Sequence, residues 1–450
     1  MADLAVIGCG YVGVVSAACF AELGHRVTCV DIDQRRAEML ASGRSPVHEP
    51  GVEELLQRGL RAGRLSFHGT YPDHLDAGIV FIAVNTPGAH EGAADLRAVR
   101  SAVSETLRRI SPGTILVNKS TVPIGTGELV NGIASKAGYH EHPVVSNPEF
   151  LREGSAVVDF RHPDRIVLGS ENEAAMETVA ALYRPLGAPI QMVDIRTAEM
   201  IKYASNAFLA TKISFINEIA EICEALGADV VEVARGMGLD SRIGAHYLQA
   251  GLGWGGSCFP KDVRALTHMA AVHGAHPQLL RAVIDINSDQ RLRIVKKVRG
   301  ALGELEGKRV LVLGAAFKGN TDDLRDSPAL ELATLLHLEG VHVTIYDPLA
   351  DGARIEAAAP FARVAADAVE GSTGADAIVV ATDCPQFRDL PLGRMRLAAA
   401  GDLLVDGRNI VDPKSARAAG FSYRCIGRPI VEGPPEPTSA ALPAAVGGAS

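Results

Sequence analysis

The sequence lacks paired cysteines, an excess of positive charge and long apolar runs, and each absence excludes a class of protein. Its seven cysteines contain no CxxC pair, which argues against a disulfide framework or a metal site and favours reduced thiols in the cytoplasm. The formal net charge of -9 argues against a nucleic-acid partner, which needs a concentrated basic surface. No apolar run is long enough to span a membrane. Because residues 1–8 carry no basic region, we expect them to begin a first strand and not a signal peptide.

What is present is an alternation of short apolar runs with helical patterns, which is typical of parallel α/β sheets. A chain of 450 residues is long enough for two or three domains. We predict an α/β protein with two Rossmann-like doubly wound domains, at residues 1–196 and 301–431. A long central helix and a helical dimerisation region, within residues 197–300, are predicted to join them. Residues 432–450, rich in Pro, Ala, Gly and Ser, are expected to form a disordered tail.

Residues 4–31 have the pattern of a strand, a glycine turn, a helix, a second strand and an acid. The turn is Gly8-x-Gly10-x-x-Gly13 and the acid is Asp31. In this context the first glycine permits the turn, the second lets a pyrophosphate approach the backbone, and the third allows close packing of the helix. A carboxylate after the second strand accepts hydrogen bonds from ribose hydroxyls and repels a 2′-phosphate. The pattern therefore predicts a dinucleotide site that prefers NAD to NADP.

Two polar turns follow later strands of the same predicted sheet. Asn85-Thr86-Pro87 and Ser120-Thr121-Val122-Pro123 each come directly after an apolar run. Ligands of open parallel sheets bind at the carboxyl ends of the strands, so both turns are expected on the cofactor side. Ordinary polar turn chemistry is the alternative.

Paired acids and a polar helix face supply further candidates. Glu149 and Glu153 are four residues apart, so on a helical turn they share one face, where they could complement the helix dipole or transfer a proton. Residues 197–226 carry the longest helical pattern, suited to joining two domains and to forming a dimer face. Lys202 and Asn206 project from one side of it. Their spacing fits a solvated stripe as well as a site.

The glycine-rich stretch 251–262 contains the only tryptophan and ends in Cys258, Lys261 and Asp262. Glycine-rich backbone bends tightly and can come close to a ligand. A nearby cation such as Lys261 is expected to lower the pKa of the Cys258 thiol and to favour the reactive thiolate. A buried, inert cysteine is the alternative.

Together the ordered motifs resemble the UDP-glucose/GDP-mannose dehydrogenase family over nearly the whole chain except the tail. Besides the three turns above, the resemblance rests on Asn147 to Gly154 (NPEFLREG), Lys202 to Asn206 (KYASN), Gly255 to Asp262 (GGSCFPKD) and Phe317 to Pro328 (FKGNTDDLRDSP). It implies NAD-dependent oxidation of the C6 alcohol of a nucleotide sugar in two steps, through a thiohemiacetal and a thioester on cysteine. The residues of these motifs are more similar to the branch of the family that oxidises UDP-glucose to UDP-glucuronate than to the branch that acts on GDP-mannose. A two-electron hydroxyacid-type dehydrogenase is a further alternative.

Carried over to this sequence, the resemblance implies three groups of site residues and a homodimer or a multiple of it. The catalytic group is Cys258 as nucleophile, Lys202 and Asn206 as oxyanion donors, and Glu149, Thr121 and Asp262 for proton transfer and water. The cofactor contacts are Gly8, Gly10, Tyr11, Val12, Gly13, Asp31, Arg36, Thr86, Thr121, Glu153 and Arg325. The substrate contacts are Glu149, Phe150, Leu151, Lys202, Asn206, Arg242, Tyr247, Gly255, Cys258, Lys318 and Arg408. The resemblance also implies that Arg242 reaches over from a partner subunit.

Overall fold

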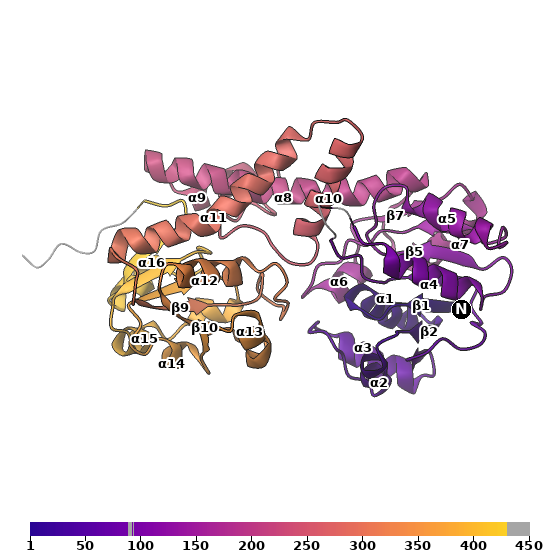
Figure 1. The fold of residues 1–450 in the computed structure, drawn as a ribbon, viewed down its shortest axis with the longest axis horizontal. Helices are drawn as coiled ribbons and strands as arrows, with labels where there is room; N and C mark the ends of the chain where they lie inside the picture. The colour runs from indigo at the N-terminus through magenta and orange to yellow at the C-terminus, as the bar shows by residue number, and fades with distance from the viewer. Residues whose placement is uncertain (89–91, 93, 430–450) are drawn as a thin grey trace, which may run out of the picture.

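The computed structural model of the chain describes residues 1–88, 92 and 94–429, and it has two sheet domains joined by one long helix (Figure 1). The tail predicted at 432–450 lies outside the described residues. Both sheets consist of parallel strands, apart from one antiparallel contact in the first, and have helices on their faces, so the predicted α/β fold with two Rossmann-like domains is confirmed.

The amino-terminal sheet has eight strands in the order β3-β2-β1-β4-β5-β6-β7-β8. All neighbouring strands run parallel except β6 and β7. The strands are β1 Asp3–Ile7, β2 Arg26–Val30, β3 Leu65–His68, β4 Ile79–Ile82, β5 Ile115–Asn118, β6 Val144–Ser146, β7 Ile166–Gly169 and β8 Ile190–Val193. The chain order reverses between β1 and β4, and in open α/β sheets such a switch point is where ligands bind.

Helices cover both faces of this sheet, because its central strands are apolar on both sides. In β1, Leu4 and Val6 pack into one buried cluster and Ala5 and Ile7 into another. The helices are α1 Tyr11–Glu22, α2 Gln34–Ala41, α3 Val52–Arg61, α4 Arg97–Leu107, α5 Thr126–Lys136, α6 Ala156–Arg161 and α7 Glu173–Tyr183, with the 3-10 turn η2 Arg184–Leu186. A sheet buried on both faces reads as continuous apolar runs, which is the pattern that the sequence shows.

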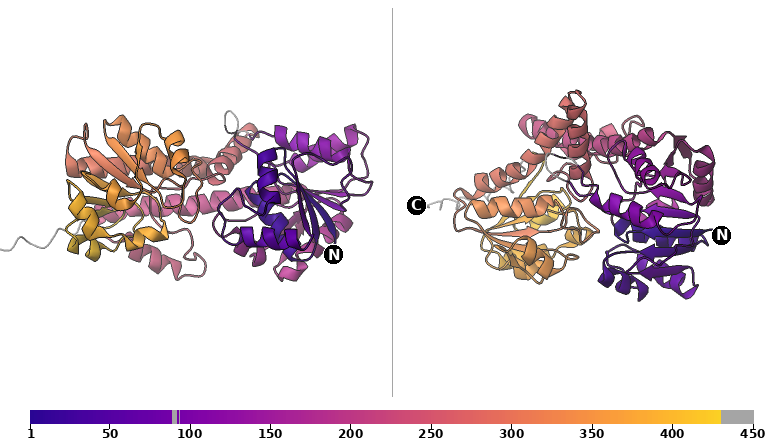
Figure 2. Two further views of the ribbon diagram at one scale, coloured as in Figure 1. Left: turned by 90° about the horizontal axis from the view of Figure 1, so that it is seen from below. Right: turned by 45° about the vertical axis from the view of Figure 1, so that its right-hand side comes forward.

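The long helix α8, Ile195–Leu226, has 32 residues and is about 48 Å long at a rise of roughly 1.5 Å per residue. Its first turn is capped by the Asp194 carboxylate, which accepts a hydrogen bond of 2.9 Å from the amide of Thr197. It ends at Gly227, which has a positive φ of 75°. Figure 2 shows α8 running from one domain to the other. The helix predicted at 197–226 is therefore present and starts two residues earlier than its pattern suggested.

Three more helices complete the connecting region, and a second sheet follows. The helices are α9 Val230–Gly238, α10 Phe259–Val272 and α11 Gln278–Leu302. The second sheet has six parallel strands in the order β11-β10-β9-β12-β13-β14. Its strands are β9 Arg309–Leu313, β10 His342–Tyr346, β11 Arg363–Val364, β12 Ala377–Val380, β13 Leu403–Asp406 and β14 Ser422–Cys425. Its helices are α12 Pro328–Leu338, α13 Gly352–Ala358, α14 Ala368–Gly371, α15 Leu392–Ala398 and α16 Pro413–Ala418, with the 3-10 turn η3 Pro385–Asp389.

The two domains share α8 as a common support. Ile216, Ala220 and Cys223 of its second half belong to the core of the carboxyl-terminal domain, while Glu199 of its first turns bonds to the amides of Gly125 and Gly127 in the amino-terminal domain. Within the described part of the chain, no helix is both long and apolar enough to cross a membrane.

Candidate active site between the two domains

The glycine turn after β1 has the shape that a dinucleotide pyrophosphate requires. Gly8 has a φ of 95°, and a Cβ at Gly13 would lie 1.9 Å from the Gly8 carbonyl oxygen, so both positions exclude a side chain. A Cβ at Gly10 would meet nothing closer than the Asn85 Oδ1 atom at 3.7 Å. The protein itself therefore leaves room at Gly10, just before the first residue of α1. Free amides and the positive end of the helix dipole face that space, and the turn fits an NAD pyrophosphate.

Asp31 follows β2 and is fixed beside this turn. Its carboxylate accepts hydrogen bonds from the amide of Cys9 at 2.7 Å, the amide of Asp33 at 2.9 Å and the Arg36 guanidinium at 3.0 Å. The side chain is almost fully buried. An anchored carboxylate at this place fits the ribose hydroxyls of NAD.

The two polar turns lie together at the carboxyl ends of adjacent strands, as the sequence predicted. The Thr86 hydroxyl donates a hydrogen bond of 2.7 Å to the carbonyl oxygen of Thr121. The Ser120 hydroxyl donates one of 2.7 Å to the carbonyl oxygen of Val84. The turns after β4 and β5 are thus held to each other on the side of the sheet where Gly8 and Asp31 lie.

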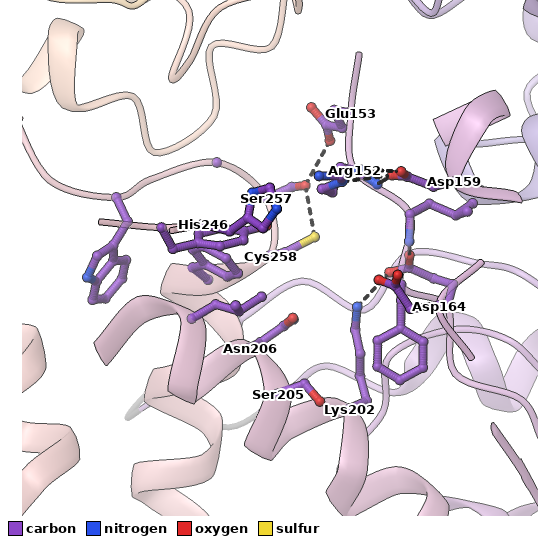
Figure 3. A pocket seen from close by; sticks show the side chains of 18 of the residues that line it. Arg152, Glu153, Asp159, Asp164, Lys202, Ser205, Asn206, His246, Ser257 and Cys258 are labelled. Carbon is purple, nitrogen blue, oxygen red and sulfur yellow. Dashed lines mark hydrogen bonds and ion pairs between the residues drawn. The ribbon is translucent and has the colours of Figure 1, made fainter. Parts of the chain in front are cut away.

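A cleft of 810 Å³ opens between the two domains and is lined by residues from both and from α8. It brings together most of the residues that the resemblance assigned to substrate and catalysis. These are Glu149, Phe150, Leu151, Lys202, Asn206, Tyr247, Gly255, Cys258, Lys318 and Arg408, and Glu153, which was assigned to the cofactor, lines the cleft with them. Figure 3 shows Lys202, Asn206 and Cys258 converging on one space.

Lys202 and Glu149 line this cleft and form a buried ion pair. The ammonium lies 3.0 Å from the Glu149 Oε1 atom, and both side chains are only 5% exposed. The amide of Leu151 donates a hydrogen bond of 2.6 Å to the other carboxylate oxygen. Burial opposes the charge on Lys202, but the carboxylates of Glu149 and Asp262 and the Cys258 thiolate raise its pKa overall. Lys202 is therefore a cation aimed into the cleft.

Asn206 lies one turn along α8 from Lys202 and bonds to Asp262 in the first turn of α10. Its amide nitrogen donates a hydrogen bond of 2.6 Å to one Asp262 oxygen, and Lys261 donates one of 2.5 Å to the other. Asp262 is fully buried. The spacing of Lys202 and Asn206 fitted a solvated surface stripe equally well, but the structure places both residues in the cleft.

Cys258 stands at the amino end of α10, partly buried and 3.6 Å from the Ser257 hydroxyl. Burial, followed by the negative charges of Glu149 and Asp262, raises the pKa of the thiol to about 11, although Lys202 opposes the shift. The expectation that Lys261 lowers this pKa is wrong, because the Lys261 ammonium pairs with Asp262 instead. The thiol is therefore protonated in the free protein at neutral pH.

The glycines before Cys258 allow the loop to pack against the carboxyl-terminal domain. Gly256 has a φ of 83°, and a Cβ there would lie 2.6 Å from the Phe317 ring. A Cβ at Gly255 would lie 2.1 Å from the carbonyl oxygen of Asp326. Both close approaches require glycine, so the loop before the candidate catalytic residue Cys258 packs directly against the second domain.

Glu153 connects three parts of the chain at the edge of the cleft. Its carboxylate accepts hydrogen bonds from the Ser257 hydroxyl at 3.1 Å, the Arg325 guanidinium at 3.3 Å and the Thr321 hydroxyl at 3.4 Å. Burial and the neighbouring Asp323 carboxylate raise the pKa of Glu153 to about 7. Tyr11 is tied to the same loop, because its hydroxyl accepts a hydrogen bond of 3.0 Å from the amide of Gly154.

Of the basic residues expected to bind a nucleotide sugar from the carboxyl-terminal half of the chain, two line the cleft and one does not. Arg408 lies in the cleft, where its guanidinium donates to the carbonyl oxygens of Ala381 at 2.8 Å and Phe317 at 3.4 Å. Lys318 also lines the cleft, and burial lowers its pKa. Arg242 has a side chain that is 87% exposed, pairs with Asp240 and does not line the cleft. This chain alone therefore does not bring Arg242 to the site.

Sequence reasoning missed several charged residues of the cleft. Lys119, Arg152 and Arg165 all line it, and the Arg165 guanidinium lies 3.6 Å from the centre of the Phe150 ring. A signal was available for Lys119, since a lysine at the end of an apolar strand is unusual. Arg165 gives a similar signal, because this charged residue directly precedes the apolar strand β7.

Comparison with known protein families matches three successive parts of the chain. Residues 2–187 match the NAD binding domain of the UDP-glucose/GDP-mannose dehydrogenase family, residues 196–289 its central domain, and residues 311–413 its UDP binding domain. The matched ranges correspond to the first sheet domain, the connecting helices and most of the second sheet domain.

Individual proteins agree with this match over nearly their full length. A UDP-glucose 6-dehydrogenase of Pseudomonas aeruginosa is 45% identical over 445 residues, covering 95% of this chain and 97% of the relative. The UDP-glucose 6-dehydrogenase TuaD of Bacillus subtilis is 44% identical over 436 residues, covering 96% and 95%. The solved structure of a UDP-glucose dehydrogenase from Pyrobaculum islandicum superposes with a TM-score of 0.87 at 42% identity, covering 94% of this chain and 97% of that one.

Proposed function

Because the chain belongs to the UDP-glucose/GDP-mannose dehydrogenase family, we propose that it oxidises UDP-glucose to UDP-glucuronate with two NAD⁺ per sugar. One observation carries the proposal: Cys258, Asn206 and the Lys202–Glu149 pair line one cleft between the parts of the chain that match the family's NAD binding and UDP binding domains, and Asn206 is hydrogen-bonded to the buried Asp262. When bound, NAD⁺ accepts the hydride that leaves C6 in each oxidation.

In the first oxidation the chain must take a proton from the C6 hydroxyl and stabilise the developing alkoxide. Glu149, one oxygen of which is held by the Leu151 amide, acts as the proton acceptor, directly or through water. Lys202 and Asn206 donate to the oxygen that carries the negative charge. Thr121 and Asp262 hold the water that later hydrolyses the thioester. The products of this step are the C6 aldehyde, NADH and a proton.

In the second oxidation Cys258 retains the aldehyde. The sulfur adds to C6 and the carbonyl oxygen takes a proton, which gives a thiohemiacetal. Loss of a second hydride and a proton gives a thioester, and water cleaves the carbon–sulfur bond to give the carboxylate and the free thiol. The sum is one alcohol, two NAD⁺ and one water converted to one carboxylate, two NADH and three protons.

A second copy of the chain is part of the proposal. Phe208, Phe215 and Ile222 recur every seventh residue on α8 and are 65%, 42% and 46% exposed. Such an apolar stripe on a long helix favours burial against the same helix of a partner. A dimer formed there supports the proposal that Arg242 of one subunit serves the other's cleft. The proposed domains remain 1–196 for NAD, 197–300 for dimerisation and the catalytic loop, and 301–431 for the nucleotide sugar.

The test is a substrate panel with the NADH yield recorded. Purified protein is given NAD⁺ and limiting UDP-glucose, UDP-galactose, UDP-N-acetylglucosamine or GDP-mannose. We expect UDP-glucose to turn over fastest and to give two NADH per sugar. Cys258→Ser is the matched control, and it should give no more than one NADH per bound sugar because the thiohemiacetal cannot form.

The alternatives give different results in the same assay. Faster turnover of GDP-mannose with two NADH would make the chain a GDP-mannose 6-dehydrogenase. One NADH per sugar with a released aldehyde would reject the thioester and favour a two-electron, hydroxyacid-type dehydrogenase. Two NADH from the Cys258→Ser protein would reject Cys258 as the nucleophile.

A further inference from the structure

Lys119 is a buried cation in the wall of the cleft, and the proposed oxidations do not use it. Its side chain is almost fully buried, and it lines the cleft. Its ammonium donates hydrogen bonds to two neutral groups, the Asn147 Oδ1 atom at 3.1 Å and the Tyr183 hydroxyl at 3.3 Å. Among the residues that the structure describes, it forms no ion pair. An unpaired buried lysine costs stability, so a structural role alone is a poor reason for it.

The contacts of Lys119 join two loops of the proposed site. Lys119 follows β5 directly and stands two residues before Thr121. Asn147 follows β6 directly and stands two residues before Glu149. The Tyr183 hydroxyl at the end of α7 donates a hydrogen bond of 2.6 Å to the same Asn147 oxygen, and the Asn147 amide nitrogen donates one of 3.0 Å to the carbonyl oxygen of Val167. Lys119 therefore ties the Thr121 loop to the Glu149 loop.

The charge of Lys119 also acts on Glu149. Burial lowers the pKa of Lys119 to about 8, Glu149 opposes this shift, and Lys202 adds to it. Below about pH 8 Lys119 is therefore protonated, and Glu149 stands in the field of two lysines. An opposite charge nearby favours the ionised form of a carboxyl group.

We propose that Lys119 is a positioning residue that fixes the Thr121 and Glu149 loops to each other and favours the ionised, proton-accepting form of Glu149. The inference rests on the proposed function, because it assigns Lys119 to the first oxidation. The charged and titratable groups around Glu149 are Lys202 on α8, Lys119 after β5, Cys258 and Asp262 at the start of α10, and Tyr183 at the end of α7.

A purely structural lysine and an electrostatic one predict different pH behaviour. Lys119→Met removes the charge but keeps much of the volume of the side chain, whereas Lys119→Arg keeps the charge. Removing a nearby positive charge disfavours the ionised form of a carboxyl group. We therefore expect the fall of kcat/KM for UDP-glucose at acid pH, the acid limb, to move to higher pH in Lys119→Met. A loop that is merely loosened lowers kcat at every pH and leaves the limb in place.

The experiment measures this limb in the full-length wild type, Lys119→Met, Lys119→Arg and Tyr183→Phe. Tyr183→Phe removes one hydrogen-bond acceptor of Lys119 but leaves the lysine protonated at acid pH, so its limb should coincide with that of the wild type. A second readout needs no turnover: proteins labelled with ¹³C at the glutamate carboxyl are titrated by NMR, and the Glu149 signal is assigned by its absence from Glu149→Gln.

The proposal is supported if the acid limb of kcat/KM and the NMR midpoint of Glu149 both move to higher pH in Lys119→Met. In Lys119→Arg both should return to their wild-type values. If Lys119→Met folds and both readouts coincide with the wild type, the proposal is overturned. If the wild type oxidises no nucleotide sugar, the proposed function fails instead, and the NMR midpoint alone decides whether Lys119 favours the ionised Glu149. If Lys119→Met does not fold, the comparison of Lys119→Gln with the wild type takes its place with the same two outcomes.

Discussion

Two glycines of the turn after β1 serve different purposes, and exchanging each for alanine separates them. Gly10→Ala adds a methyl group whose nearest protein atom would be 3.7 Å away. Gly10 has a φ of -69°, which alanine adopts freely. Gly13→Ala adds a methyl group 1.9 Å from the Gly8 carbonyl oxygen and 3.4 Å from the Ala83 Cβ. The first change meets only a ligand, and the second meets the protein itself.

The expected sizes follow from these distances. At Gly13 the methyl group and the carbonyl oxygen must separate from 1.9 Å to beyond 3.0 Å, so α1 has to move away from β1. Overpacking of this kind costs about 1–3 kcal/mol, which lowers Tm by at least roughly 2 °C in a domain of this size. At Gly10 the stability should stay within about 0.5 kcal/mol of the wild type. Its methyl group occupies the approach of the pyrophosphate, and we expect NAD⁺ to bind at least about tenfold more weakly, a loss of roughly 1.4 kcal/mol.

The assay is paired for each variant: Tm by calorimetry without ligand, and Kd for NAD⁺ by isothermal titration at a temperature where all proteins are folded. Wild-type affinity in Gly10→Ala would show that the pyrophosphate does not lie on this turn. An unchanged Tm in Gly13→Ala would show that the close contact between α1 and β1 does not contribute to stability.

Two other predictions concern the thiol and the partner subunit. The Cys258 pKa is about 11 in the free protein, and thiolate is the reactive form, so alkylation of Cys258 by iodoacetamide should be slow at pH 7 and should rise steadily to pH 10. The Glu149→Gln variant lacks a negative charge that raises this pKa, so its alkylation at pH 8 should be faster than in the wild type. Equal rates in the two proteins would contradict the electrostatic account. Arg242→Ala and Cys258→Ser should each abolish most turnover, yet co-expressed mixed dimers should recover activity, because one cleft then combines an intact thiol with the partner's Arg242; no recovery would mean that Arg242 does not act across the interface.

The sequence predicted the features that repeat along the chain or depend on short spacing. The turn at Gly8, the acid at Asp31 and the long helix through Lys202 and Asn206 each have a local cause, namely a backbone requirement or a helical period. The doubly wound α/β arrangement of the two domains followed from the alternation of apolar runs and helices. The strands β7 and β8 at one end of the first sheet, and the antiparallel contact of β6 with β7, were not predicted, because short apolar runs do not specify their neighbours.

Features that depend on which charge meets which partner were harder to predict. Lys261 is three residues from Cys258 in the sequence, yet its ammonium pairs with Asp262, because a neighbouring carboxylate competes with the thiol. Lys119 reaches Asn147 and Tyr183, which are brought near it only by the sheet and α7. Glu153 meets Arg325 across two domains. Such pairings depend on tertiary structure, so local patterns do not reveal them.

The charges around Cys258 bear on when the thiol becomes reactive in the proposed reaction. In the free protein the negative charge of Glu149 raises the pKa of the thiol while Lys202 lowers it. In the proposed first oxidation Glu149 accepts the proton of the C6 hydroxyl, and its negative charge disappears. Lys202 then acts on the thiol with one opposing carboxylate fewer, so the thiol pKa falls when the aldehyde is present. In the proposed mechanism the thiol therefore ionises more readily after the carbonyl that it attacks has formed.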